Sequence, residues 1–219
     1  MGYNIAIDGP AGAGKSTIAK MVAKQLNFIY VDTGAMYRAI ALYMIKNGIG
    51  KDEELIAKNV KNANVKIAYV DGEQQVLLNE ENVSGCIRTE EVGNMASFVA
   101  KVGEVRAQLL DLQRALAASE NVIMDGRDIG THVLPNADKK IYLTASVEER
   151  AQRRYKELCE KGEKCVLEEI EKDIMARDEQ DMNREIAPLK KAEDAILLDS
   201  SDMTIDQVVE RIIQIYKEN

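Results

Sequence analysis

The sequence predicts an α/β fold in which a mainly parallel sheet carries helices on both faces. Short apolar runs recur along the chain and alternate with longer segments whose apolar residues repeat at helical spacing. Glycine or aspartate follows several of the apolar runs directly. This alternation is typical of parallel sheets covered by helices, whose ligands bind at the carboxyl ends of the strands.

The first part of the chain is predicted to form strand, turn, helix, strand and helix. An apolar run over residues 3–7 leads into a glycine-rich turn at residues 9–14, and residues 15–26 then repeat apolar side chains at helical spacing. A second strand is expected at residues 28–31. The next helix, from about residue 34 to 46, is expected to end there because an Asn-Gly pair follows.

The pattern changes near residue 64, where a hairpin interrupts the α/β alternation. Residues 65–69 alternate apolar and polar side chains, Asp71 and Gly72 form a turn signal, and residues 75–78 supply a partner strand. We therefore expect a small inserted lobe at about residues 60–105. Its sheet spans about 64–89, and helices are expected at 90–100 and 103–118.

The parallel sheet is expected to resume after this lobe and to continue to the end of the chain. The predicted strands lie at residues 121–124, 140–143 and 195–198, and the predicted helices at 147–161, 167–180 and 204–216. The two charged helices form a helical lid at about residues 150–185. One core over residues 1–219 would carry both the lobe and the lid.

Composition narrows the classes of function. The chain has 219 residues, of which 46% are hydrophobic, so it can bury a full core. Its formal net charge of -8 argues against a surface that neutralises a nucleic-acid backbone. The three cysteines, Cys86, Cys159 and Cys165, lack metal-ligand spacing and are expected to be reduced thiols.

The sequence also bears on location and partners. We see no basic leader at the N-terminus and no apolar run of the roughly 20 residues that a membrane span requires. We therefore expect a cytoplasmic monomer without a nucleic-acid or membrane partner.

The glycine-rich turn matches the phosphate-binding pattern G-x-x-x-x-G-K-[ST]. It lies between a predicted strand and a predicted helix, as the mechanism of phosphate binding requires. Lys15 is expected to reach the β- and γ-phosphates of a nucleoside triphosphate, and Ser16 to bind the accompanying Mg²⁺ directly. The alternative is a purely structural turn that packs a helix on a strand and binds no phosphate. The predicted ATP-binding residues are Gly9, Pro10, Ala11, Gly12, Ala13, Gly14, Lys15, Ser16 and Thr17.

The phosphate loop predicts a P-loop three-layer fold, but leaves open hydrolysis, switching or transfer to an acceptor. Arginines near strand ends favour transfer, because planar guanidinium groups bind a second phosphate at two points. Arg38 follows the second strand, and Asp125, Arg127 and Asp128 follow the strand at 121–124. Asp125 is also expected to bind Mg²⁺ through water. Each group alone fits a solvated loop with a surface ion pair equally well.

The charged stretch from Arg150 to Arg184 is expected to be mainly a solvated helix face. The pairs Glu149–Arg153 and Glu157–Lys161 have the i,i+4 spacing of exposed ion pairs. We assign that surface role to most of the stretch, Arg150 included. The exceptions are expected to close over the transferring phosphoryl group and are Arg153, Arg154, Arg177 and Arg184.

These motifs together resemble those of the bacterial cytidylate kinases over nearly the whole chain. The resemblance is carried by the segments Gly9 to Ser16, Asp32-Thr33-Gly34-Ala35-Met36-Tyr37-Arg38, Ile87-Arg88-Thr89, Asp125-Gly126-Arg127-Asp128-Ile129-Gly130 and Arg177-Asp178 through Asn183-Arg184. It implies transfer of the γ-phosphate of ATP to CMP, and to dCMP, with Mg²⁺ as cofactor. It also matches the inserted hairpin lobe.

The resemblance further implies roles for individual residues. It assigns cytosine contacts to Thr33, Ser97, Arg106 and Asp128, sugar contacts to Arg177 and Asp181, acceptor-phosphate contacts to Arg38, Arg127 and Arg184, and catalytic roles to Lys15, Arg127, Arg153 and Arg154. Gln180 stands where some relatives carry a further lid arginine.

Several alternatives stay open at this point. A kinase for AMP, UMP or shikimate shares the phosphate loop, and the inserted hairpin with the Asp-Gly-Arg-Asp segment argues against it. A zinc-bearing lid needs two close cysteine pairs, which the sequence lacks. A GTP-dependent switch needs a guanine-reading Asn-Lys-x-Asp segment, which does not occur.

Overall fold

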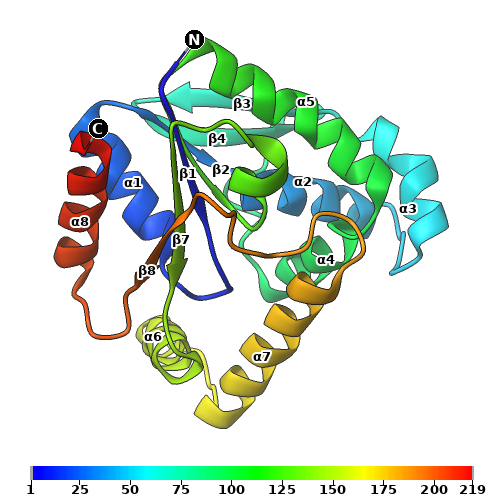
Figure 1. Ribbon diagram of the computed structural model, residues 1–219. Helices are drawn as coiled ribbons and strands as arrows, with labels where there is room; N and C mark the ends of the chain where they lie inside the picture. The colour runs from blue at the N-terminus through cyan, green and yellow to red at the C-terminus, as the bar shows by residue number, and fades with distance from the viewer. Residues whose placement is uncertain (1, 219) are drawn as a thin grey trace. The chain divides into compact units, whose positions relative to one another are not determined.

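The computed structural model describes residues 2–218 (Figure 1). The chain forms two compact units. Unit 1 contains residues 29–122 together with the N-terminal residues up to Tyr3. Unit 2 contains residues 4–28 and the chain from residue 123 onward.

Unit 2 is built on four of the five strands of the larger sheet. Their order is β6-β1-β7-β8, and β1 pairs in parallel with β7, as β7 does with β8. Ile7 lies opposite Ile141 in the first of these pairs, and both side chains are almost fully buried. The strands are β1 (Asn4–Asp8), β6 (Val122–Gly126), β7 (Lys139–Thr144) and β8 (Ile196–Asp199).

Helices of unit 2 pack in two pairs, which Figure 1 shows as α1 with α8 and α6 with α7. They are α1 (Lys15–Leu26), α6 (Val147–Glu160), α7 (Leu167–Asn183) and α8 (Ile205–Lys217). Ala151, Ile170 and Ile174 form a small apolar core between α6 and α7. The Ser146 side chain caps α6 by accepting the N–H of Glu149 at 3.2 Å. A one-turn helical segment, η2 (Ile129–Val133), follows β6.

Unit 1 combines one strand of the larger sheet with a separate antiparallel sheet. Strand β2 (Ile29–Asp32) leads into α2. The Asp32 side chain caps the N-terminus of α2 by accepting the N–H of Ala35 at 2.9 Å. Helix α4 packs on α2. The other elements are α2 (Thr33–Lys46), α3 (Glu53–Asn59), η1 (Val60–Asn62), β3 (Val65–Val70), β4 (Glu73–Leu78), β5 (Glu81–Asn82), α4 (Glu90–Val99) and α5 (Gly103–Ser119).

The predicted fold class is confirmed, and the antiparallel hairpin of β3 and β4 is present. Four short elements were missed, namely α3, η1, β5 and η2. Helix α3 has only seven residues and buries only Ile56, so its periodicity is too weak to stand out. Within residues 2–218, no helix is both long and apolar enough to cross a membrane.

Candidate active site

The phosphate loop adopts a backbone that its glycines make possible. Gly12 and Gly14 have φ angles of 75° and 79°, in the left-handed region that favours glycine. Gly9 has a φ of 152°, and a Cβ there would lie 1.9 Å from the carbonyl oxygen of Leu143. The loop therefore turns tightly from β1 into α1. Gly14, directly before α1, has no side chain to cap the first N–H groups of that helix, which favours anion binding there.

Lys15 lies inside this loop. Its side chain is buried, and Nζ donates a hydrogen bond to the carbonyl oxygen of Pro10 at 2.7 Å. Burial lowers the pKa of Lys15 well below its usual value, and the charge of Arg127 lowers it further, whereas Asp125 and Asp181 oppose the shift. An anion arriving at the loop would add negative charge beside this amine and so favour its protonated form.

Ser16 and Asp125 provide two oxygen groups next to Lys15. The Ser16 hydroxyl donates to Oδ2 of Asp125 at 2.9 Å, and Asp125 is buried at the end of β6. A hydroxyl and a carboxylate are oxygen ligands of the kind that Mg²⁺ prefers. The chemistry of this pair therefore fits magnesium.

Asp8, the last residue of β1, is a further buried group that sequence reasoning missed. Its two carboxyl oxygens accept the N–H groups of Ile129 and Gly130 at 2.8 and 2.7 Å. Burial raises the pKa of Asp8 to about 6, although these two hydrogen bonds oppose the shift. Asp8 thus fixes the turn after β6 to the strand that precedes the phosphate loop. The only sign of this role in the sequence is that Asp8 directly precedes Gly9, the first residue of the phosphate loop.

Two ion pairs join the end of β6 to the end of α7. Arg127 Nε lies 2.9 Å from Oδ2 of Asp181, and Arg184 Nη2 lies 3.0 Å from Oδ1 of Asp128. The Arg184 and Asp128 side chains are both almost fully buried. The structure therefore brings together these four predicted CMP-binding residues, which are over 50 positions apart in sequence.

Arg150 contradicts the prediction of a solvated helix face. Its side chain is only 5% exposed, and Nη1 lies 2.6 Å from Oδ2 of Asp178 on α7. Nη1 also donates to the carbonyl oxygen of Ala11 at 2.8 Å, while Oδ1 of Asp178 accepts the Ala11 N–H at 3.1 Å. The helical periodicity placed Arg150 among charged neighbours, but the first turn of α6 packs on the phosphate loop.

Arg153 and Arg154 both contact protein groups. Arg153 Nη2 donates to the carbonyl oxygen of Ser200 at 2.7 Å, and Arg154 Nη1 lies 3.0 Å from Glu157. The two expected i,i+4 pairs, Glu149–Arg153 and Glu157–Lys161, are present. The side chains of Arg153 and Arg154 are 35% and 43% exposed. Arg177 lies one turn before Asp181 on α7.

Of the five remaining predicted CMP-binding residues, Arg177 belongs to unit 2 and the other four belong to unit 1. Thr33 is buried at the start of α2, Arg38 lies further along that helix, and Ser97 lies on α4. Arg106 on α5 is buried, with its guanidinium carbon 5.8 Å from the centre of the Tyr37 ring. Arg106 also donates from Nη1 to the carbonyl oxygen of Ala100 at 3.3 Å.

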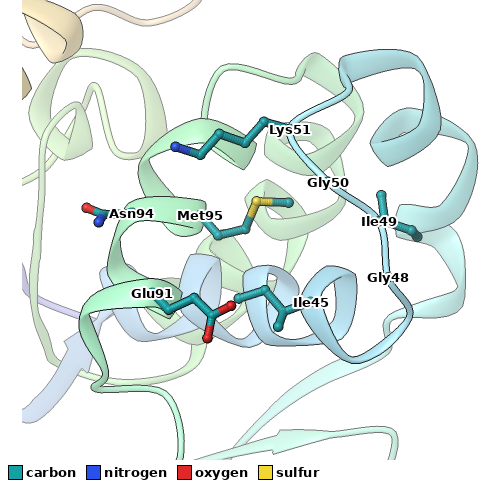
Figure 2. Close-up of a pocket in the computed structure, with 8 residues that line it drawn as sticks. All are labelled: Ile45, Gly48, Ile49, Gly50, Lys51, Glu91, Asn94 and Met95. Carbon is teal, nitrogen blue, oxygen red and sulfur yellow. The ribbon is translucent and has the colours of Figure 1, made fainter.

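Unit 1 also contains a cavity between the end of α2 and α4 (Figure 2). Its lining consists of Ile45, Gly48, Ile49, Gly50, Lys51, Glu91, Asn94 and Met95. None of these belongs to the predicted ATP- or CMP-binding residues. This cavity is therefore separate from the predicted site.

Known proteins match this chain over nearly its whole length. The family model described as cytidylate kinase matches residues 5–218. The cytidylate kinase of Alkaliphilus oremlandii is 53% identical over 218 residues, covering 97% of each chain. That of Caldicellulosiruptor bescii is 50% identical over 214 residues, covering 97% of this chain and 95% of the relative.

Solved structures share the fold at low sequence identity. An uncharacterized protein from Eubacterium ventriosum is 12% identical with a TM-score of 0.57, covering 99% of both chains. A sugar kinase from Janibacter is 14% identical with a TM-score of 0.51, covering 99% of this chain and 95% of that one. The family model and the sequence relatives identify the family, and this chain belongs to the cytidylate kinases.

Proposed function

We propose that this protein transfers the γ-phosphate of ATP to CMP, and also to dCMP, giving ADP with CDP or dCDP. The observation that carries the proposal is the buried Lys15 within a phosphate loop whose next residue, Ser16, is bonded to Asp125. Membership in the cytidylate kinase family supports CMP as the acceptor. The use of dCMP as a second acceptor is proposed in addition to the use of CMP.

The donor phosphates would be held by the loop from Gly9 to Thr17. The N–H groups of the turn and the positive end of α1 attract anionic oxygens, and Lys15 contributes a full charge. Ser16 would hold magnesium directly and Asp125 would do so through water. Magnesium would offset the negative charge of the β- and γ-phosphates.

The acceptor phosphate would be bound by Arg38, Arg127 and Arg184. Arg127 and Arg184 are held by carboxylates, which orient their guanidinium planes in advance. The sugar would contact Arg177 and Asp181. This pre-orientation supports two-point recognition of a phosphate, which a single lysine does not provide.

The cytosine edge would be read by Thr33, Ser97, Arg106 and Asp128. Hydroxyl, guanidinium and carboxylate groups match the O2, N3 and amino group of cytosine. Uracil reverses the donor pattern at that edge, so it would leave buried polar groups unpaired. We infer on this ground that CMP is preferred over UMP.

Transfer needs no covalent intermediate. A phosphate oxygen of CMP is already anionic near neutral pH, so it can attack without a strong general base. Lys15, Arg127, Arg153 and Arg154 would neutralise charge that develops on the moving phosphoryl group. The partial exposure of Arg153 and Arg154 supports movement of these side chains on substrate binding.

We propose that the protein is a monomer located in the cytoplasm and that it binds Mg²⁺, ATP and CMP. We propose neither nucleic acid nor membrane as a partner. The net charge of -8 supports the first of these exclusions.

A product assay tests the proposed function. The protein is incubated with ATP labelled on the γ-phosphate, CMP and Mg²⁺, and the nucleotides are separated by chromatography. We expect label in CDP, and dependence of ADP release on both CMP and Mg²⁺. Label found only in inorganic phosphate at the same rate with and without CMP would indicate hydrolysis and contradict the proposal.

A further inference from the structure

Two of the three cysteines face each other at the tip of the α6–α7 hairpin. The sulfur atoms of Cys159, in the last turn of α6, and Cys165, two residues before α7, lie 3.9 Å apart. Cys159 is exposed and Cys165 is partly buried, so an oxidant dissolved in water can reach the pair. This juxtaposition plays no part in the proposed phosphoryl transfer.

The backbone between the two cysteines is already folded into a reversal. Gly162 has a φ of 76° and donates its N–H to the carbonyl oxygen of Cys159 at 2.9 Å. Cys165 packs on the small core between the helices, and its thiol lies 4.0 Å from the carbonyl oxygen of Tyr155 on α6. The fold therefore returns the chain so that Cys165 lies against α6, near Cys159.

We propose that Cys159 and Cys165 form a reversible intramolecular disulfide when the protein meets a peroxide. A thiol sulfur rotates about its Cα–Cβ bond, so a sulfur separation of 3.9 Å lies within reach of bond formation without refolding of the hairpin. Cys86 belongs to unit 1 and has no part in this reaction.

The reaction balances with one peroxide molecule per disulfide. The thiolate of the more exposed Cys159 attacks one peroxide oxygen, the O–O bond breaks, and Cys159 becomes a sulfenic acid while one water leaves. The Cys165 sulfur then attacks the Cys159 sulfur, the S–O bond breaks, and the second water leaves. Two thiols lose two electrons and two protons, and hydrogen peroxide is reduced to two water molecules.

The disulfide would join α6 and α7 at the end opposite Arg150 and Asp178. Cys159 lies nine residues beyond Arg150 on α6, which is about 13 Å along the helix. The ion pair already joins the two helices near the phosphate loop. A covalent link at the tip would hold the helices that carry Arg153, Arg154 and Arg177 as one body.

Thiol counting and peptide mapping test the proposal on the full chain. The reduced protein is treated with a small excess of hydrogen peroxide, the remaining thiols are alkylated, and intact mass and proteolytic peptides are analysed. We expect the free thiols to fall from three to one, with a Cys159–Cys165 link that dithiothreitol reverses. Cys86→Ser should fall from two thiols to none.

Two comparisons show whether the fold directs formation of the disulfide or whether the cysteines oxidise at random. The link should form several-fold faster in the native protein than in the same protein in denaturant, and hydrogen exchange in residues 158–168 should slow after oxidation. Cys159→Ser and Cys165→Ser should both lose the intramolecular link. Equal rates in denaturant, pairing with Cys86, only intermolecular disulfides or three retained thiols would each overturn the proposal. These readouts require no kinase activity, so they are independent of the proposed function.

Discussion

Arg150 and Asp178 form a buried ion pair that holds both peptide groups of Ala11 in the phosphate loop. Arg150 binds the carbonyl oxygen of Ala11 and Asp178 binds its N–H, and the two charged groups lie 2.6 Å apart. Helices α6 and α7 are thus connected through this pair to the loop that holds the donor phosphates. Loss of one partner leaves an uncompensated buried charge, which is strongly unfavourable.

We expect Asp178→Asn to lower the free energy of unfolding by about 3 kcal/mol, because Arg150 loses its counter-charge in a buried setting. Urea denaturation of the variant measures this. The matched control is Glu157→Gln, which removes half-exposed ion pairs on α6 and should cost less than about 1 kcal/mol. Equal effects of the two substitutions would contradict the structural role of the Arg150–Asp178 pair.

Lys15→Ala should reduce kcat by roughly 10²- to 10³-fold, because a preorganised charge at the transferring phosphoryl group is lost. The KM for CMP should change little, since CMP is expected to bind other residues. Steady-state kinetics with ATP and CMP varied separately measures both. Lys24→Ala removes an exposed lysine from the same helix and is expected to leave kcat unchanged. A Lys15→Ala variant with the kcat of the unmodified protein would contradict the assignment.

Asp8 should make stability depend on pH. Burial raises the pKa of Asp8 to about 6 in the folded protein, from 3.8, so between these values the folded state holds a proton that the unfolded chain releases. The stabilisation from this proton is fully present below the unfolded pKa. It is lost as pH rises through 6, and amounts to about 3 kcal/mol.

Urea denaturation of the unmodified protein and of Asp8→Asn, from pH 4 to 7 without nucleotide, tests this expectation. The unmodified protein should lose stability relative to Asp8→Asn as pH rises, and the difference should level off above pH 6. The loss of a hydrogen bond in the variant adds a constant offset that does not alter this trend. A difference that is independent of pH would show that Asp8 titrates at its ordinary value.

Asp128→Ala should impair the use of CMP more than the binding of ATP, because Asp128 is proposed to read cytosine. We expect the KM for CMP to rise on the order of tenfold or more, which corresponds to the loss of a hydrogen bond to a charged group. The Kd for ATP, from equilibrium titration, should stay nearly constant. Asp128 also pairs with Arg184, so Asp128→Asn is measured beside it to retain the side-chain shape. Unchanged CMP kinetics in both variants would refute the base-reading role.

The elements that could be predicted from the sequence are those specified by neighbouring residues in the chain. Helix α1 spans the predicted residues, and the turn at Asp71 and Gly72 joins β3 to β4 as expected. The glycine spacing of the phosphate loop was equally informative, because a residue with a Cβ at Gly9 would collide with the neighbouring strand.

Tertiary contacts account for what the sequence did not disclose. Arg150 has the same charged neighbours as Arg153 and Arg154, yet it is buried because it faces the phosphate loop. In the sequence, Asp8 resembles any aspartate at the end of a strand. Its role depends on hydrogen bonds from the turn after β6, which lies more than 120 residues later in the chain. Such pairings depend on topology, which residue spacing along one helix or strand does not encode.

The acceptor preference tests the central claim most directly. The initial rate of ADP release is measured with ATP, Mg²⁺ and increasing concentrations of CMP, dCMP, UMP or AMP. We expect kcat/KM to be highest for CMP, with dCMP accepted and with UMP and AMP much poorer. A kcat/KM for AMP equal to or above that for CMP would contradict the account.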